Sequence, residues 1–179
     1  MALTERITLQ LPGTINQINA FRRSLISEVS MIAPSKVEIR RNTTAMTDEF
    51  LAQRIGLIPF VQDDTIDPET LKASLKVSGR NATTNDILGV DVAYKDVEIA
   101  VIDHNQELDL DVFFTRGTSG THAQFARVCA VSMFPSGKPG VQTVAFTPLI
   151  PNDGHVCVSE AWNALSSMVD TAFAALEKS

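Results

Sequence analysis

Two pairs of side chains in this 179-residue sequence have the residue types of a thiol nucleophile and its base. They are His122 with Cys129, and His155 with Cys157. Such a pair needs a thiol of low pKa and a third group that orients the histidine. No enzyme signature surrounds either cysteine, and Cys129 in "ARVCAV" is typical of a small core hydrophobe. A Cys/His hydrolase is therefore a remote alternative.

Residues 117–122, "GTSGTH", form a glycine-rich loop of a kind that can cradle phosphates. The loop lacks the P-loop lysine and precedes no suitable helix, so phosphate binding gains little support. The cysteines have no C-x-x-C spacing, which argues against a metal knuckle or a disulfide framework. We expect no catalytic residue, no metal and no cofactor in this chain.

The composition is that of an ordinary globular protein, with 44% hydrophobic residues and a formal charge of −6. An acidic chain is a poor direct partner for nucleic acid or an anionic membrane, because phosphate binding relies on excess Lys and Arg. No apolar run approaches the roughly 20 residues that span a bilayer. We expect an intracellular protein without direct nucleic-acid or membrane contact.

The N-terminal third alternates strands and helices. Residues 5–11 and 36–41 alternate polar and apolar side chains, as strands do. A helix follows Thr14 and ends before Pro34, and a short helix covers residues 47–55. At 100° per residue, the apolar side chains of the first helix fall on one arc, formed by Ile15, Ile18, Phe21, Leu25, Ile26 and Val29.

The remainder is β-rich until the last helix. The acidic residues 61–68 lose periodicity and mark a domain boundary, and the turn cluster at residues 135–140 marks a second one. The expected strands cover residues 71–77, 97–102, 107–114, 126–134 and 141–147. Ser159 is the expected cap of the last helix. The fold class is therefore α+β.

Two consecutive arginines occupy different faces of the first helix. Arg22 falls on the apolar arc between Ile18 and Ile26, whereas Arg23 points away from it. A charge on a buried face must extend to water or meet a carboxylate. We expect either that extension or a structural ion pair of Arg22 with Asp48 or Glu49.

Several blocks resemble the alpha-like subunit of multisubunit DNA-directed RNA polymerases, in the third-subunit branch of eukaryotes, archaea and large DNA viruses. The blocks are "NAFRRSLISEVS" at 19–30, "NTT" at 42–44, "DEFLAQRIGLIPF" at 48–60, "TTNDI" at 83–87 and "NQELDLDVFFTRGTSGTHAQF" at 105–125. The resemblance covers nearly the whole chain.

The resemblance implies a discontinuous dimerisation domain, an antiparallel sheet with helices on one face, interrupted by an inserted β-rich domain. We expect residues 1–60 and 140–179 to form the dimerisation domain and residues 61–139 the insert. Such a subunit is a scaffold that pairs with a smaller alpha-like subunit and carries the largest and second-largest polymerase subunits. Catalysis belongs to those large subunits, and the implied location is the nucleus, or the cytoplasm or virion if the source is viral.

The sequence also departs from the family pattern. Gln53 stands where relatives usually have His, and residues 60–100 lack the cysteine cluster that many relatives carry. The short chain without that cluster fits a reduced lineage such as a large DNA virus.

The resemblance assigns two interfaces. The implied dimer interface consists of Ile18, Phe21, Leu25, Trp162, Leu165, Val169, Ala172, Phe173 and Leu176. The implied contacts to the large subunits are Arg23, Asn42, Thr43, Thr44, Arg54, Gly117 and His122. The alternatives are core packing for the apolar set and simple solvation for the polar set. A self-pairing subunit of the bacterial type is the alternative assembly.

Overall fold

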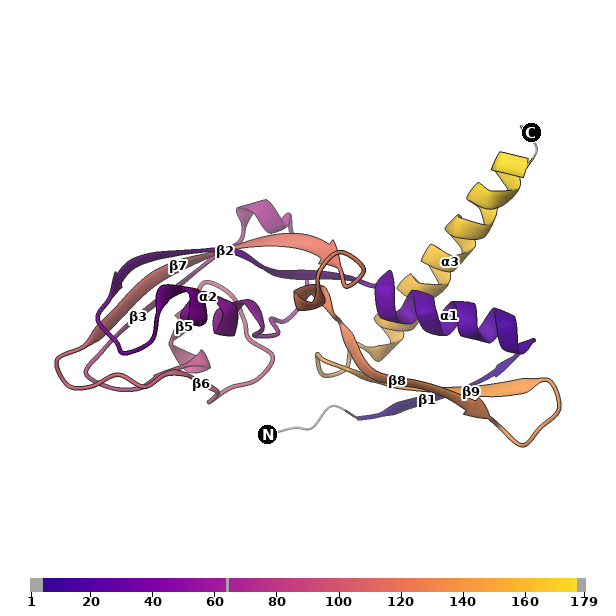
Figure 1. Ribbon diagram of the computed structural model, residues 1–179, viewed down its shortest axis with the longest axis horizontal. Coiled ribbons are helices and arrows are strands. Elements are labelled where there is room, and N and C mark those ends of the chain that lie inside the picture. Colours follow the sequence, from indigo (N-terminus) through magenta and orange to yellow (C-terminus); the bar gives the residue numbers. More distant parts are fainter. Residues whose placement is uncertain (1–4, 64, 177–179) are drawn as a thin grey trace. The chain divides into compact units, whose positions relative to one another are not determined.

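The computed structural model describes the backbone of residues 5–63 and 65–176, and side chains as far as residue 171 (Figure 1). The described residues divide into two compact units: unit 1 holds residues 32–117, and unit 2 holds residues 5–31 and 118–176. Both crossings between the units fall inside strands, β2 (Ser30–Asn42) and β7 (Glu107–Thr118).

The two units and the two expected domains have different bounds. Residues 32–60 belong to unit 1, and residues 118–139 belong to unit 2. The segment after residue 60 is tied to the first residues of unit 1, because the Gln62 amide accepts from the Ile32 N–H (2.6 Å) and donates to the Ile32 carbonyl (3.0 Å). The division into a dimerisation domain and an insert stays a prediction.

Unit 2 is a three-stranded antiparallel sheet with two long helices, in the strand order β1-β9-β8. Its elements are β1 (Ile7–Pro12), α1 (Ile15–Ser27), the 3-10 turn η3 (Ala123–Phe125), β8 (Val128–Pro135), β9 (Val141–Pro148) and α3 (Gly154–Leu176). Val144 and Phe146 of β9 are fully buried and pack with Phe21 and Leu25 of α1. This burial holds α1 on the sheet.

Unit 1 contains a four-stranded sheet in the order β2-β7-β3-β5 and a small second sheet, β4-β6. Its other elements are α2 (Asp48–Gly56), η1 (Pro68–Thr70), β3 (Lys72–Ser78), β4 (Ala82–Thr83), η2 (Thr84–Asp86), β5 (Ile87–Leu88) and β6 (Glu98–Ala100). The α+β prediction is confirmed, because antiparallel strands and a few separate helices build both units.

Strand β2 is longer than the expected strand at residues 36–41, and it runs straight through Pro34. Proline has no N–H to donate and is confined to edge strands within sheets. β2 is the first strand of the order β2-β7-β3-β5, so it has a neighbour on one side only. Sequence reasoning missed this extension because it treated the proline as a break.

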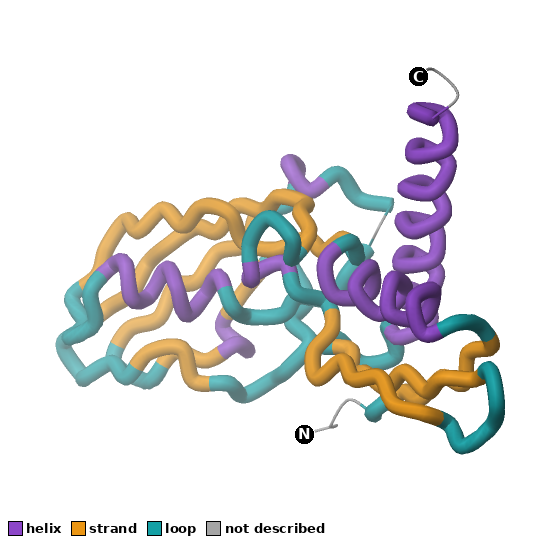
Figure 2. The backbone as a smooth tube through the Cα atoms, turned by 45° about the vertical axis from the view of Figure 1, so that its right-hand side comes forward, coloured by secondary structure: helices purple, strands orange, loops and turns teal. Residues whose placement is uncertain are grey.

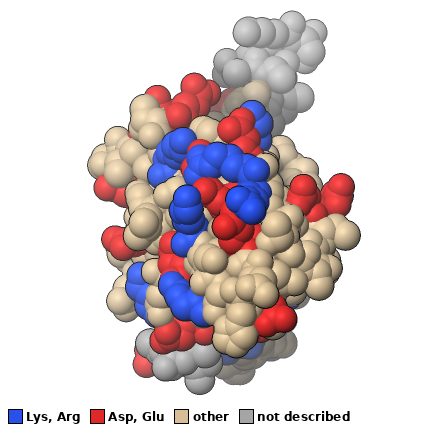
Figure 3. Space-filling view, turned by 90° about the vertical axis from the view of Figure 1, so that its left-hand side faces the viewer, with Lys and Arg blue, Asp and Glu red and all other residues tan. Residues whose placement is uncertain are grey.

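The sheet of unit 1 carries a network of ion pairs across three strands. Arg40 of β2 pairs with Asp109 (2.5 Å) and with Asp111 of β7, while Lys72 and Lys76 of β3 pair with Asp111 (2.9 Å) and Asp109 (3.3 Å). Hydrogen bonds from Arg40 lower the pKa of Asp109, and those from Lys72 lower the pKa of Asp111. Basic and acidic side chains alternate on one face of the molecule (Figure 3).

Strand β8 contains a bulge opposite β9. Cys129 faces Thr147 and Ser132 faces Ala145, so the two residues between them on β8 oppose one on β9. Ala130 adopts a left-handed conformation there, with φ of 52°. A side chain with a Cβ is disfavoured in that region by roughly 1 kcal/mol.

Candidate functional site

Helix α1 is fixed at its start by a reciprocal cap. The Thr14 hydroxyl accepts from the Gln17 N–H (3.4 Å), and the Gln17 side chain accepts from the Thr14 N–H (3.0 Å). The cap sets the residue at which the helix begins, and with it the face that meets the sheet.

The buried face of α1 differs from the predicted apolar arc. Ile18, Phe21 and Leu25 are buried as expected, but Ile15 and Ile26 are exposed. Ser24 lies inside the buried face instead, and its hydroxyl donates to the Ala161 carbonyl of α3 (2.8 Å). The small serine lets the two helices approach, which rotates Ile15 and Ile26 toward solvent.

A groove of about 390 Å³ lies between α1 and α3. Trp162 stacks on Phe21 at 4.6 Å between ring centroids, yet it stays 43% exposed. Val169 is 45% exposed farther along the groove. The second half of α3 extends past α1 and the sheet of unit 2 (Figures 1 and 2). An apolar stripe on such a helix is available to another chain.

The predicted dimer residues divide into three groups. Phe21 and Leu25 are fully buried and support the groove from within the core of unit 2. The residues that line the groove are Ile18, Trp162, Leu165 and Val169. The side chains of Ala172, Phe173 and Leu176 lie outside the described part of the chain.

Helix α3 begins at Gly154, so the prediction that Ser159 caps it was wrong. Gly154 leaves room for β1, since a Cβ there would come within 1.8 Å of the Ile7 Cδ1 atom. The Cys157 N–H donates to the Asp153 carbonyl (3.1 Å), which closes the first turn.

A buried arginine anchors this end of α3. Arg127, whose side chain is 1% exposed, holds both carboxylate oxygens of Asp153 (2.5 and 2.9 Å). Its Nη1 donates to Glu160 (3.2 Å) and to the Ser30 carbonyl (2.9 Å). Glu160 in turn accepts from the Ser30 N–H (2.8 Å). Sequence reasoning missed this network because its members are far apart in the chain and singly unremarkable.

The glycine-rich loop after β7 closes the C-terminal end of α1. The Gly120 N–H donates to the Ser27 carbonyl (3.1 Å), and the Ser119 hydroxyl donates to the Ile26 carbonyl. These bonds satisfy helix carbonyls that would otherwise lack partners. These bonds hold the loop, whose last residue is His122, at the end of α1 that carries the exposed Arg23.

The remaining predicted polar contacts lie in unit 1. The Asn42 side-chain amide donates to the Met46 carbonyl (2.8 Å). The Thr43 hydroxyl donates to the Glu107 carbonyl and accepts from the Glu107 N–H. Thr44 donates from its N–H to the Asn42 side chain (3.0 Å). These bonds fix the turn between β2 and α2.

Arg54 of α2 donates to the Glu98 carbonyl (2.7 Å) and lies over the Phe50 ring at 5.9 Å. Gly117, the first residue of the glycine-rich loop, is the last residue of unit 1. The predicted large-subunit contacts thus fall in both units, and their role stays a prediction.

Arg22 and its predicted acidic partners have other contacts in their own units. The Arg22 Nε donates to Asn19 (2.9 Å), within unit 2. In unit 1, Asp48 accepts from the Asn42 amide (2.7 Å), and Asp48 and Glu49 occupy the first turn of α2, where the helix dipole favours anions. An ion pair of Arg22 with either carboxylate stays a prediction.

The His155 and Cys157 pair does not form an activated site, and Cys129 is exposed, so the prediction that it is a core residue was wrong. Burial, and then the neighbouring Asp153 carboxylate, raise the pKa of Cys157 to about 12, while His155 is exposed. A thiol with this pKa is protonated at neutral pH and unreactive. Within the described residues, no group of three or more His, Cys, Asp or Glu side chains could hold a metal ion.

The sequence is similar to known RNA polymerase subunits. It is 30% identical over 130 residues to the DNA-directed RNA polymerase subunit Rpo3 of Methanocaldococcus jannaschii, covering 71% of this chain and 68% of that protein. The mouse DNA-directed RNA polymerases I and III subunit RPAC1 is 28% identical over 159 residues, covering 64% of this chain and 46% of that protein.

The DNA-directed RNA polymerase II subunit rpb3 of Dictyostelium discoideum is 26% identical over 168 residues, covering 76% of this chain and 52% of that protein. The chain therefore spans about half the length of the two eukaryotic relatives. No family model matches the sequence.

The chain belongs to the family of alpha-like subunits of DNA-directed RNA polymerase that includes archaeal Rpo3 and eukaryotic Rpb3.

Among the described residues, no helix combines the length and apolar character needed to cross a membrane.

Proposed function

We propose that this chain is a non-catalytic scaffold in transcription, which pairs with a smaller alpha-like subunit and carries the two large polymerase subunits. Family membership supports the role in transcription. The exposed apolar side chains along α3 are the observation that supports pairing with another subunit. The chain would act where the polymerase assembles, in the nucleus, or in the cytoplasm or virion for a viral source.

The pairing surface in this proposal is the α1–α3 groove. Trp162, Met168 and Val169 expose between 43% and 48% of their surface. Burying one such side chain fully contributes roughly 1.5–3 kcal/mol, so a partner helix that covers the stripe gains several kcal/mol. The proposal extends the surface to Ala172, Phe173 and Leu176 on the last turns of α3.

We favour a smaller, different partner over a second copy of this chain. The favouring feature is the sequence of residues 105–125, which is similar to the heterodimeric branch of the family rather than to the bacterial one. Self-pairing through the same groove is the alternative, and a solution mass separates the two.

The large subunits, in this proposal, bind Arg23 and the loop that ends at His122. Arg23 is exposed and has a guanidinium suited to bidentate contact with a carboxylate. The loop stiffens this end of α1 through its bonds to Ser27 and Ile26. Asn42, Thr43, Thr44, Arg54 and Gly117 are assigned to the same role.

Two variants test whether these surfaces are separate. Leu165→Asp combined with Val169→Asp should abolish pairing with the smaller subunit, because two carboxylates cannot be buried in an apolar interface. Arg23→Glu should leave that pair intact and reduce recovery of the large subunits by about tenfold or more, since a hydrogen bond to a charged group contributes about 1.5–3 kcal/mol. Pull-downs scored for both kinds of partner measure these effects.

Matched controls separate surface effects from unfolding. Ser167→Asp adds a carboxylate to α3 on the side opposite Leu165, and Lys138→Glu reverses an exposed charge in the β8–β9 turn. Both controls should retain all partners. Equal loss of both kinds of partner in the two test variants would contradict the assignment of separate surfaces.

A further inference from the structure

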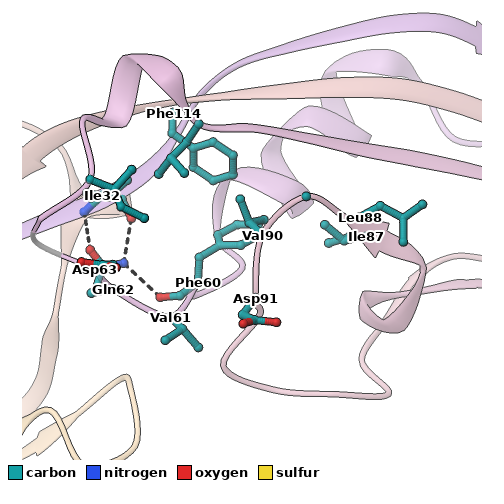
Figure 4. Close-up of a pocket in the computed structure, with 13 residues that line it drawn as sticks. Ile32, Phe60, Val61, Gln62, Asp63, Ile87, Leu88, Val90, Asp91 and Phe114 are labelled. Carbon is teal, nitrogen blue, oxygen red and sulfur yellow. Dashed lines mark hydrogen bonds between the residues drawn. The ribbon is translucent and has the colours of Figure 1, made fainter.

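A cavity of about 740 Å³ in unit 1 has no role in the proposed assembly. Residues 60–63 and Ile66 form one border, and residues 87–91 form the other (Figure 4). The floor is apolar, since Ile32, Phe60 and Phe114 line the cavity and are at most 4% exposed. A cavity of this volume, with an apolar floor, is within the range of ligand pockets in proteins.

The walls of the cavity are held by hydrogen bonds, so it exists before anything binds. The Gln62 amide spans the backbone of Ile32 and the carbonyl of Phe60 (2.9 Å), as the dashed lines in Figure 4 show. The Val61 N–H donates to the Asp91 carbonyl (2.9 Å), which joins the two borders directly. A preformed pocket avoids the ordering cost that weakens binding at mobile loops.

The rim of the cavity presents apolar side chains to solvent. Val61 is 53% exposed, Ile66 is 38% exposed and Leu88 is 66% exposed, and all three line the cavity. Leu88 belongs to β5, the last strand in the order β2-β7-β3-β5. Exposed apolar side chains gathered around a cavity are typical of a binding surface.

The borders carry one sign of charge. Residues 61–69 and 87–91 contain aspartates and a glutamate but no lysine or arginine. Asp63 and Asp91 both line the cavity. Bonds from the hydroxyl and N–H of Thr65 lower the pKa of Asp63, because they favour its charged form. Such a rim attracts cations and repels acidic partners.

We propose that this cavity docks an extended segment of another protein in which one bulky apolar side chain is flanked by lysines or arginines. The apolar side chain enters over Phe60 and Phe114, and the flanking cations meet Asp63 and Asp91. This proposal does not depend on the scaffold function, because the cavity lies in unit 1 and the proposed pairing groove in unit 2.

The test is a fluorescence polarisation titration of the full chain with a short fluorescein-labelled peptide, a central leucine flanked by lysines. Replacing the leucine with alanine should weaken binding by about tenfold or more, since burial of the leucine side chain provides most of the apolar contribution to the binding free energy. Replacing the lysines with glutamates should abolish binding, and raising the salt concentration should weaken it.

Variants locate the binding at the cavity. Leu88→Asp and Asp91→Lys should each weaken binding by about tenfold. The controls Val101→Asp and Glu49→Lys make the same changes at exposed positions of unit 1 that do not line the cavity, and should bind like the parent chain. Circular dichroism confirms that each variant is folded.

Three results would overturn the proposal: no binding of the basic peptide, equal binding of the alanine or glutamate peptide, or equal effects of cavity and control variants. None of them affects pairing through α3, so failure here is distinguishable from failure of the scaffold function.

Discussion

The two units each contain a network of arginines and carboxylates, but the networks differ in burial. In unit 2, Arg127 is 1% exposed and holds Asp153 and Glu160. In unit 1, Arg40 is 51% exposed at the edge of the Asp109 and Asp111 pairs. The arginine is therefore buried in unit 2 and open to water in unit 1, where the carboxylate of Asp111 is 7% exposed and also pairs with Lys72.

This difference in burial decides how much the loss of one partner costs in each network. Removing one member of a buried pair leaves an uncompensated charge in a low dielectric, whereas water takes over from a lost partner at the surface. The buried network also fixes the start of α3, the helix proposed to bind the partner. We expect the network of unit 2 to be essential for folding and that of unit 1 to adjust stability with pH.

The largest expected effect comes from Arg127→Ala. It leaves Asp153 buried without its bidentate partner and should lower the free energy of unfolding by about 3–5 kcal/mol. Urea unfolding followed by circular dichroism measures this loss. The matched change Arg40→Ala should have a much smaller effect, and similar losses in the two variants would refute the comparison.

A double replacement sharpens the same point. Arg127→Met with Asp153→Asn removes the buried charges of the bidentate pair and should be more stable than Arg127→Ala alone, because no unpaired carboxylate remains in that pair. A double variant less stable than the single one would mean that the arginine acts through packing rather than charge.

The network of unit 1 should make the free energy of unfolding depend on pH. The pKa values of Asp109 and Asp111 are lowered in the folded chain, so their contribution to stability is present above the ordinary pKa of about 3.9 and is lost as pH falls through the folded pKa. Asp111→Asn should therefore be less stable than the parent at pH 7. The two urea midpoints should converge as the pH falls through the lowered pKa, and a constant difference at every pH would contradict the assignment.

The smallest effect is expected at the bulge three residues after Arg127. Ala130→Gly should stabilise the chain by about 0.5 kcal/mol, because relief of the left-handed Ala exceeds the extra entropy of an unfolded glycine. Ala126, with φ of −67°, is the control, and Ala126→Gly should be destabilising. A loss of thermal stability in Ala130→Gly would mean that the methyl group packs usefully.

Local patterns predicted much of the fold. The α1 cap at Thr14, the strands β3, β6 and β7, and the turn at residues 135–140 all follow from neighbouring residues. Features that depend on long-range contacts were not predicted. Strand β2 continues through Pro34 because it is an edge strand, and α3 starts at Gly154 because Arg127 holds Asp153. Periodicity contains no information on either contact.

The candidate sites were predictable to a similar degree. Trp162, Leu165 and Val169 follow from helical spacing, and the structure places them along one groove. The exposure of Ile15 and Ile26 could not be predicted, since it depends on Ser24 bonding across to α3. The cavity of unit 1 was also hidden, because its borders are separated by more than twenty residues of sequence.

The central claim is that this chain pairs with a different, smaller alpha-like subunit. Native mass spectrometry of the tagged full chain, purified from cells that contain its own transcription machinery, tests this claim most directly. The account predicts a species with one copy of this chain and one copy of a smaller alpha-like subunit, together with larger species that also contain the two large subunits. A homodimer of this chain without any other polymerase subunit would contradict it.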